Sequence, residues 1–126
     1  MFYAPKETIK SYYVPVLLGT GCGSCLLSLK IFLKTGIVSY ICDAKIRPLN
    51  FLYPFSRFFR AASPENTLLL VEQLRYFSEH FPDGLPVLVT LGGRYLDFIE
   101  KNRRTLENYF LICDKNSFFG IFPAKN

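Results

Sequence analysis

The sequence predicts an α/β domain with a Rossmann-like parallel sheet of four to five strands and helices on both faces. Its length of 126 residues suits one compact domain. Half of the residues are apolar and 17% are aromatic, which excludes a disordered chain. Short apolar runs alternate with longer stretches of helical periodicity, and this order is typical of a parallel sheet. We expect the domain to span residues 13–114, between an N-terminal arm (1–12) and a C-terminal tail (115–126).

Two short apolar runs in the first third of the chain predict parallel strands. Val14–Leu18 ends at Gly19, which indicates a strand followed by a tight turn. Ile37–Cys42 is a second run, and it ends at Asp43. Because both runs are apolar almost without interruption, we expect helices to cover both faces of their sheet.

The segment between these two runs predicts a helix over Cys22–Lys34 that completes a βαβ unit. Leu26, Leu29 and Leu33 share one face, and further apolar residues cover much of the rest. We therefore expect this helix to be heavily buried. Gly36 is its expected C-terminal stop.

The middle of the chain predicts a loop, a short strand and a second helix. Residues 45–55 are irregular and contain two prolines, whereas Arg57–Ala61 fits a short strand. Ser63 and Pro64 are typical of an N-cap and a first helical position. The apolar stripe that follows consists of Leu70, Leu74, Phe77 and Phe81.

The last third predicts a strand, a helix and a final strand. Pro86–Leu91 is a buried strand closed by glycines, and Phe110–Cys113 is a strand that ends at Asp114. Between them, Arg94–Tyr109 predicts a more polar helix. Arg103 falls within its apolar stripe, so we expect a bend near Asn102. The stripe consists of Leu96, Ile99 and Leu106.

Charge and hydropathy exclude several classes of protein. Fifteen Lys and Arg against ten Asp and Glu give a net charge of +5, but the cations form no dense run. We therefore expect no nucleic-acid partner. The uncharged stretch Ser11–Leu29 is interrupted by Pro15 and three glycines, so we expect neither a membrane span nor a secretory signal. The single histidine, His80, excludes catalysis by two histidines of one chain, and its position predicts that it caps a helix end.

Four cysteines, at positions 22, 25, 42 and 113, are interpreted as thiols of a cytoplasmic protein. The chain has ample apolar residues for a core and does not need a disulfide scaffold. A four-thiolate metal site would need a second C-x-x-C, so we expect no metal site.

Glycines and charged residues gather where the predicted strands end. Parallel sheets bind ligands beyond the carboxyl ends of their strands. Backbone N–H groups of glycines approach anions there, and an arginine adds a charge-assisted contact. The candidate ligand-binding residues are Gly19, Thr20, Gly21, Asp43, Gly92, Gly93 and Arg94.

Two patterns offer an alternative function as a small oxidoreductase. Residues 19–24 (GTGCGS) partly match the dinucleotide fingerprint, and Asp43 stands about where a ribose-binding acid would. Cys22 and Cys25 form a C-x-x-C at a predicted helix start, as in redox proteins. The competing interpretation is that the glycines are turn residues and the cysteines are small apolar residues on a buried helix.

An aromatic cluster follows the second strand. It offers a partner surface or part of the core, and the core is the simpler explanation. Its members are Phe51, Tyr53, Phe55, Phe58 and Phe59.

Two segments together resemble a known family. Residues 14–20 read VPVLLGT, and residues 92–103 read GGRYLDFIEKNR, followed by Leu106, Tyr109 and Phe110. The pair is similar to the pre-ATP-grasp domain of ATP-grasp ligases, in the D-aspartate ligase and carbamoyl-phosphate-synthase-like group. The resemblance covers about residues 13–119. The sequence departs from the family at Gly21 and Gly93, where the family carries aspartate.

The resemblance implies a substrate-facing role for Gly19, Thr20, Arg94 and Tyr95. It implies an isolated or truncated module of an ATP-dependent carboxylate–amine ligase, whose ligand is a small carboxylate or amino acid. The tail at 115–126 would begin the linker to an ATP-grasp domain. We expect no catalytic residues and no cofactor in this chain, because ATP and magnesium belong to that domain. The expected partner is an ATP-grasp catalytic domain or a second copy of the chain.

Overall fold

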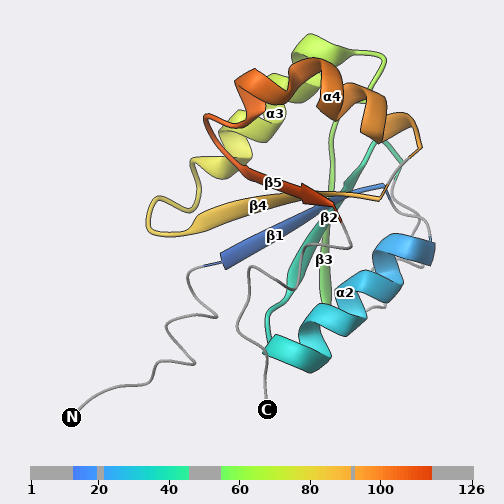
Figure 1. Cartoon of the computed structure of the whole chain (residues 1–126), viewed down its shortest axis with the longest axis vertical. Helices are drawn as coiled ribbons and strands as arrows, with labels where there is room; N and C mark the ends of the chain where they lie inside the picture. Colours follow the sequence, from blue (N-terminus) through green and yellow to red (C-terminus); the bar gives the residue numbers. More distant parts are fainter. Residues whose placement is uncertain (1–12, 20–21, 46–54, 92, 115–126) are drawn as a thin grey trace.

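The computed structural model describes residues 13–19, 22–45, 55–91 and 93–114. They form a five-stranded, all-parallel sheet in the order β3-β2-β1-β4-β5. Helix α2 covers one face, and α3 and α4 cover the other (Figure 1). This arrangement confirms the predicted Rossmann-like α/β fold. The elements are β1 (Tyr13–Leu18), α2 (Cys22–Thr35), β2 (Ser39–Asp43), β3 (Ser56–Arg60), α3 (Thr67–Ser78), β4 (Leu85–Thr90), α4 (Arg94–Leu106) and β5 (Leu111–Asp114).

Two hydrophobic cores lie on opposite sides of the sheet. Val16 and Leu18 of β1 belong to the core beneath α3 and α4, and Leu17 belongs to the core beneath α2. Successive side chains of a strand point to opposite faces, so a strand buried on both faces must be apolar throughout. This geometry explains the uninterrupted apolar runs from which the strands were predicted.

The order of the strands places a topological switch point between β1 and β4. The chain builds outward from β1 through β2 to β3, and then returns through α3 to β4, which pairs with β1 on its other side. In open α/β sheets a crevice forms at such a point, beyond the carboxyl ends of the strands. The segments after Leu18 and Thr90 therefore start from the position where this fold binds ligands.

Helix α2 presents a different face to the sheet from the one predicted. Leu27 and Ile31 are buried, whereas Leu26 and Leu33 are 62% and 63% exposed. The buried side includes Ser28, whose hydroxyl lies 2.6 Å from the Ser56 hydroxyl on β3. Both sides of this helix are apolar, so counting apolar positions did not identify the inner one. The predicted end of this helix at Lys34 is confirmed to within one residue, because α2 ends at Thr35.

Helix α3 begins later than predicted. Ser63 and Pro64 lie in a turn, closed by a hydrogen bond from the Asn66 N–H to the Ser63 carbonyl, and Asn66 is the N-cap. Within the helix, Leu70 and Leu74 are fully buried as predicted.

Helix α4 ends three residues earlier than predicted, at Leu106, and a turn leads to β5. The predicted bend is confirmed, because Asn102 has non-helical φ and ψ angles of −116° and 16°. The predicted stripe is wrong at Leu96, which is 41% exposed, and right at Ile99 and Leu106, which are fully buried.

The remaining predicted boundaries need small corrections. β2 begins two residues after Ile37, β3 spans 56–60 rather than 57–61, and β4 spans 85–90. Phe51 and Tyr53 lie outside the described residues, while Phe58 and Phe59 pack against the two cores on opposite faces of β3. Within the described ranges, no helix is long and apolar enough to cross a bilayer.

Candidate functional site

Tyr95 lies across the carboxyl end of the central strand and joins three strand ends. It is the second residue of α4 and is only 4% exposed. A Cβ placed on Gly19, just after β1, would lie 3.6 Å from the Cδ2 atom of the Tyr95 ring. The Tyr95 hydroxyl donates a hydrogen bond of 2.7 Å to Oδ1 of Asp43, the last residue of β2. One side chain therefore links the segments that follow β1, β2 and β4.

Gly19 takes a backbone conformation that favours glycine. Its φ angle is +102°, and its N–H donates to the Cys42 carbonyl at 2.7 Å. A side chain is rarely tolerated at this angle. The turn after β1 therefore depends on glycine for its backbone angle.

We expect Gly19→Ala to lower the free energy of unfolding by more than about 1 kcal/mol, because alanine is strained at this φ. Gly23→Ala is the matched control. Gly23 lies in α2, and a Cβ there meets nothing within 4 Å. The control should raise stability by about 0.4–1 kcal/mol, since it restricts the unfolded chain. Urea unfolding of both variants measures the two changes, and an equal effect in both would contradict the role of the backbone angle.

Burial and charge at this site disfavour ionisation of two neutral groups. Burial, followed by the hydrogen bond to Asp43, raises the pKa of Tyr95 above its ordinary range. Burial, followed by the charge of Asp43, raises the pKa of the Cys42 thiol to about 12. Asp43 Oδ1 also accepts the Ala44 N–H at 2.6 Å. The Asp43 carboxylate thus accepts hydrogen bonds from Tyr95 of α4 and from Ala44, the residue after β2.

The raised pKa of Tyr95 predicts a loss of stability at high pH. An unfolded tyrosine loses its proton near pH 10, whereas folded Tyr95 keeps it to higher pH. The folded state then binds more protons, so its advantage is complete below about pH 10 and is lost as the pH rises further. We expect urea unfolding between about pH 9 and 11 to show a smaller decrease for Tyr95→Phe than for the unchanged chain. Parallel curves for the two proteins would contradict this assignment.

The Cys42 thiol is expected to resist alkylation in the folded protein. Cys42 is fully buried, and its raised pKa keeps the reactive thiolate scarce at neutral pH. We expect iodoacetamide to modify Cys42 only in denaturant, as measured by peptide mass spectrometry. Cys25 is half-buried and serves as the internal comparison. Equal labelling of the two cysteines in native buffer would contradict the burial of Cys42.

Arg94 stands beside Tyr95 at the start of α4. Its guanidinium carbon lies 5.9 Å from the centre of the Tyr95 ring, and Nη2 is 2.7 Å from Oε1 of Glu65. Both side chains of this ion pair are more than half exposed. A hydrogen bond from Ser63, followed by that from Arg94, lowers the pKa of Glu65. Arg94 is the residue predicted to bind a ligand carboxylate. In this structure it is already paired with the Glu65 carboxylate.

A groove of about 370 Å³ runs between the start of α3 and α4 next to this pair. Its charged side chains form two pairs of opposite charge, Arg94 with Glu65 and Lys101 with Asp97 at 3.3 Å. The groove is therefore polar and close to neutral. It is lined by Pro64, Glu65, Thr67, Arg94, Asp97, Phe98 and Lys101.

The structure brings together part of the predicted site. Tyr95 is hydrogen-bonded to Asp43 and lies close to Gly19, and Arg94 adjoins Tyr95. Gly93 is the N-cap of α4 with a φ angle of +69°. Thr20, Gly21 and Gly92 lie outside the described residues. Sequence reasoning missed Glu65, because no local signal marks a carboxylate that approaches Arg94 from a segment before α3.

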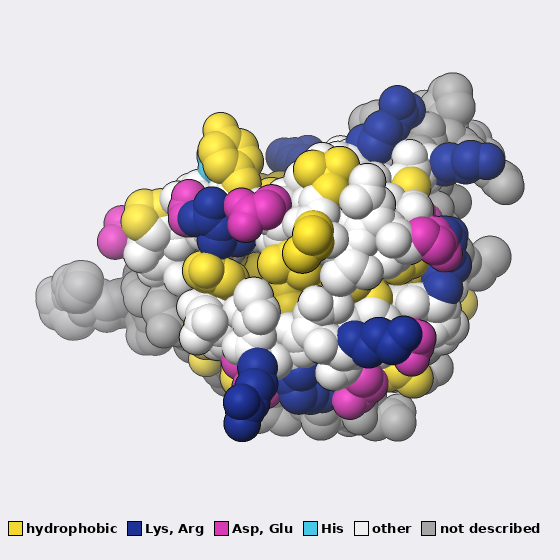
Figure 2. All heavy atoms as spheres, turned by 90° about the horizontal axis from the view of Figure 1, so that it is seen from above, with side chains coloured by type: hydrophobic (Ala, Val, Ile, Leu, Met, Phe, Trp, Pro, Cys, Tyr) yellow, Lys and Arg dark blue, Asp and Glu magenta, His cyan; other side chains and the backbone are white. Residues whose placement is uncertain are grey.

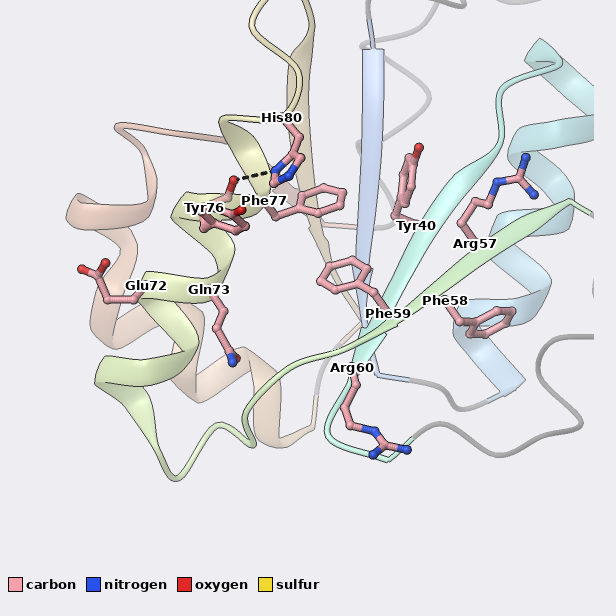
Figure 3. A pocket seen from close by; sticks show the side chains of 10 residues that line it. All are labelled: Tyr40, Arg57, Phe58, Phe59, Arg60, Glu72, Gln73, Tyr76, Phe77 and His80. Carbon is pink, nitrogen blue, oxygen red and sulfur yellow. Dashed lines mark hydrogen bonds between the residues drawn. The ribbon is translucent and has the colours of Figure 1, made fainter.

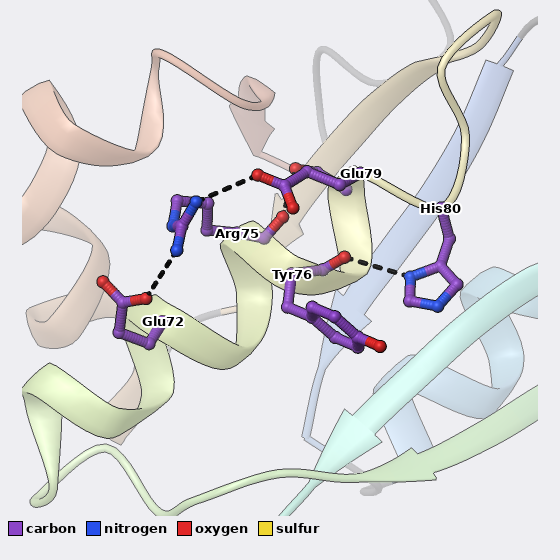
Figure 4. A network of polar contacts seen from close by, with 6 residues as sticks. Glu72, Arg75, Tyr76, Glu79 and His80 are labelled. Atoms are coloured by element: carbon purple, nitrogen blue, oxygen red, sulfur yellow. Dashed lines mark hydrogen bonds and ion pairs between the residues drawn. The ribbon is translucent and has the colours of Figure 1, made fainter.

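The structure places the backbone of the C-x-x-C, and the question of a metal site is answered for the described residues. The C-x-x-C sits at the start of α2, as predicted. The described ranges hold no group of three or more His, Cys, Asp or Glu side chains that would bind a metal ion. His80 has the predicted capping role, because its Nδ1 donates to the Tyr76 carbonyl at 3.0 Å near the end of α3 (Figure 4).

Comparisons with models of protein families, with curated proteins and with solved structures find no match to this chain. The fold is thus established by the structure, and the family resemblance stays a prediction.

Proposed function

We propose that this chain is a substrate-binding module of the pre-ATP-grasp kind, which presents a small carboxylate or amino acid to the catalytic domain of an ATP-dependent ligase. It contributes no catalytic residue in this proposal. ATP and magnesium are bound by the partner domain, and the phosphate transfer takes place there.

The proximity of Tyr95 to Gly19 carries the proposal. The two segments that resemble the family are far apart in the chain, yet they meet at the carboxyl edge of the sheet. The hydrogen bond from Tyr95 to Asp43 adds the end of β2 to the same cluster. This cluster lies next to the switch point between β1 and β4, where parallel sheets bind small molecules.

Arg94 supplies the recognition of a carboxylate in this proposal. Its present partner, Glu65, is 70% exposed, and exposed ion pairs contribute only about 0–1 kcal/mol. A ligand carboxylate that makes two parallel hydrogen bonds to the guanidinium replaces Glu65 at little cost. Glu65 then acts as a competitor that keeps the empty site neutral.

Ligand titration of the purified chain tests this arrangement. We expect D-aspartate, L-aspartate or succinate to bind by calorimetry, and Arg94→Gln to abolish binding. Glu65→Gln removes the competitor and should tighten binding several-fold, whereas the neutral diamide succinamide should not bind. Both substitutions are at exposed positions, so each variant should fold. Equal binding of succinate and succinamide, or weaker binding by Glu65→Gln, would overturn the proposal.

A second set of measurements separates the module from an enzyme. The purified chain should neither hydrolyse MgATP nor gain thermal stability from MgATP or NAD(P)H. A dinucleotide at about 100 times its dissociation constant would add about 2.7 kcal/mol, which a thermal shift detects. Insulin reduction that is lost in Cys22→Ser would instead support the redox alternative. ATP turnover, a shift with NAD(P)H or thiol-dependent reduction would each contradict a non-catalytic ligase module.

A further inference from the structure

A second pocket lies at the opposite edge of the sheet from β5, between α3 and the strands β2 and β3. Its volume is about 640 Å³, which is within the range of small-molecule sites. Figure 3 shows Tyr40, Phe59, Phe77, Tyr76 and His80 around this space.

The topology leaves this pocket open. Helix α3 connects the edge strand β3 to β4, so it must cross above β2 and β1. Its fully buried residues, Leu70 and Leu74, pack in the core beneath α3 and α4. Phe77 stacks on Phe59 of β3 at a centroid distance of 4.6 Å, and the sheet edge beyond that contact stays only partly covered.

The walls of the pocket are aromatic rings held in fixed orientations. Tyr40 meets Phe77 edge-on at 5.2 Å and Phe81 at 5.5 Å. On the outer side, Tyr76 and His80 form another edge-on pair at 4.7 Å. Such rings offer faces and edges to a flat apolar molecule, and their mutual contacts limit their rotation.

The polar groups at the rim are mainly donors. The Gln73 side-chain oxygen already accepts the Ala62 N–H at 2.6 Å. Arg57 lies on the same face of β3 as Phe59, two residues further along, because successive side chains of a strand alternate between the two faces. Arg57 is exposed and has no acidic partner among the described residues. The acidic residue of the lining, Glu72, is 2.9 Å from Arg75 and is neutralised by it (Figure 4).

We propose that this pocket binds a flat aromatic molecule that carries a carboxylate or another anionic group. The rings of the walls hold the apolar part, and the Arg57 guanidinium, which lies beside Tyr40 in Figure 3, holds the anion. This site is separate from the carboxyl edge, since its lining shares no residue with the groove beside Arg94. The inference therefore does not depend on the proposed ligase module.

A matched pair of probes tests both halves of the proposal. 2-Naphthoate has the expected ring and charge, and 2-naphthalenemethanol has the ring without the charge. His80 is the only histidine, so its imidazole protons give isolated NMR signals from the wall of the pocket. We expect 2-naphthoate to shift these signals saturably, with an affinity about tenfold higher than that of the alcohol, because a charge-assisted hydrogen bond contributes at least that much.

Arg57→Gln should remove the preference for the anion while leaving the protein folded, because Arg57 is exposed. Arg104→Gln, the same change at an exposed position of α4, is the control and should keep the preference. Equal affinities for the two probes in the unchanged chain would overturn the anionic part. No shift of the His80 signals with either probe, or a shift that tracks dimerisation in sedimentation, would overturn the site itself.

Discussion

Tyr95→Ala is expected to lower the free energy of unfolding by about 3–5 kcal/mol, the usual cost of removing a buried aromatic side chain. Domains of this size have about 5–15 kcal/mol in total, so the variant should be close to unfolding at ambient temperature. The cost is high because the ring is buried close to Gly19 and its hydroxyl donates a hydrogen bond to Asp43. Equilibrium urea unfolding, followed by far-ultraviolet circular dichroism, measures the change.

Tyr95→Phe separates the ring from the hydroxyl. We expect it to cost about 1–3 kcal/mol, because the Asp43 carboxylate loses a donor in a half-buried position. Combined with Asp43→Asn, it should cost less than the sum of the single changes, since the two groups interact. Additive changes, or a stability of Tyr95→Ala equal to that of Tyr95→Phe, would contradict the role given to this side chain.

Ile31→Ala and Leu33→Ala should differ sharply although both remove a branched aliphatic side chain from α2. Ile31 is fully buried against the sheet and its loss should cost about 2–5 kcal/mol. Leu33 is 63% exposed, and its replacement should change stability by less than about 0.5 kcal/mol. Thermal unfolding of the two variants under identical conditions checks the prediction.

The comparison of these two variants decides the orientation of α2. A large cost at Leu33 and a small cost at Ile31 would mean that the helix turns its other apolar stripe to the sheet.

Figure 2 shows the other side of the molecule, where α3 and α4 lie. Hydrophobic side chains stand there among Lys, Arg, Asp and Glu. On α2, the exposed large hydrophobic residues are Leu26, Phe32 and Leu33.

The order and type of the elements could be predicted because they depend on local properties of the chain. Parallel strands buried on both faces need continuous apolar runs, as in residues 14–18 and 86–91. Helix ends need glycine or a cap, and Gly36 ends α2 with a φ angle of +78°. The bend at Asn102 was predictable because a charged Arg103 interrupted an otherwise apolar stripe.

The buried side of a helix could not be predicted where both sides are apolar. Leu26, Leu29 and Leu33 have the same spacing as a buried stripe, but the sheet contacts Leu27 and Ile31 instead. The hydroxyl pair of Ser28 and Ser56 lies on that buried side. Only the packing of α2 on the sheet makes these polar positions interior.

The sequence by itself determined which residues stand at the carboxyl edge, because strand ends are local features and parallel strands end together. Strand ends therefore identified Gly19 and Asp43 as candidates, and the family resemblance added Tyr95. The tertiary structure alone decided their contacts: Tyr95 reaches across β1 to Asp43, and Arg94 is paired with Glu65. It also formed the aromatic pocket from β2, β3 and α3. Such contacts depend on strand order and helix crossing, which bring together residues that no spacing along the chain relates.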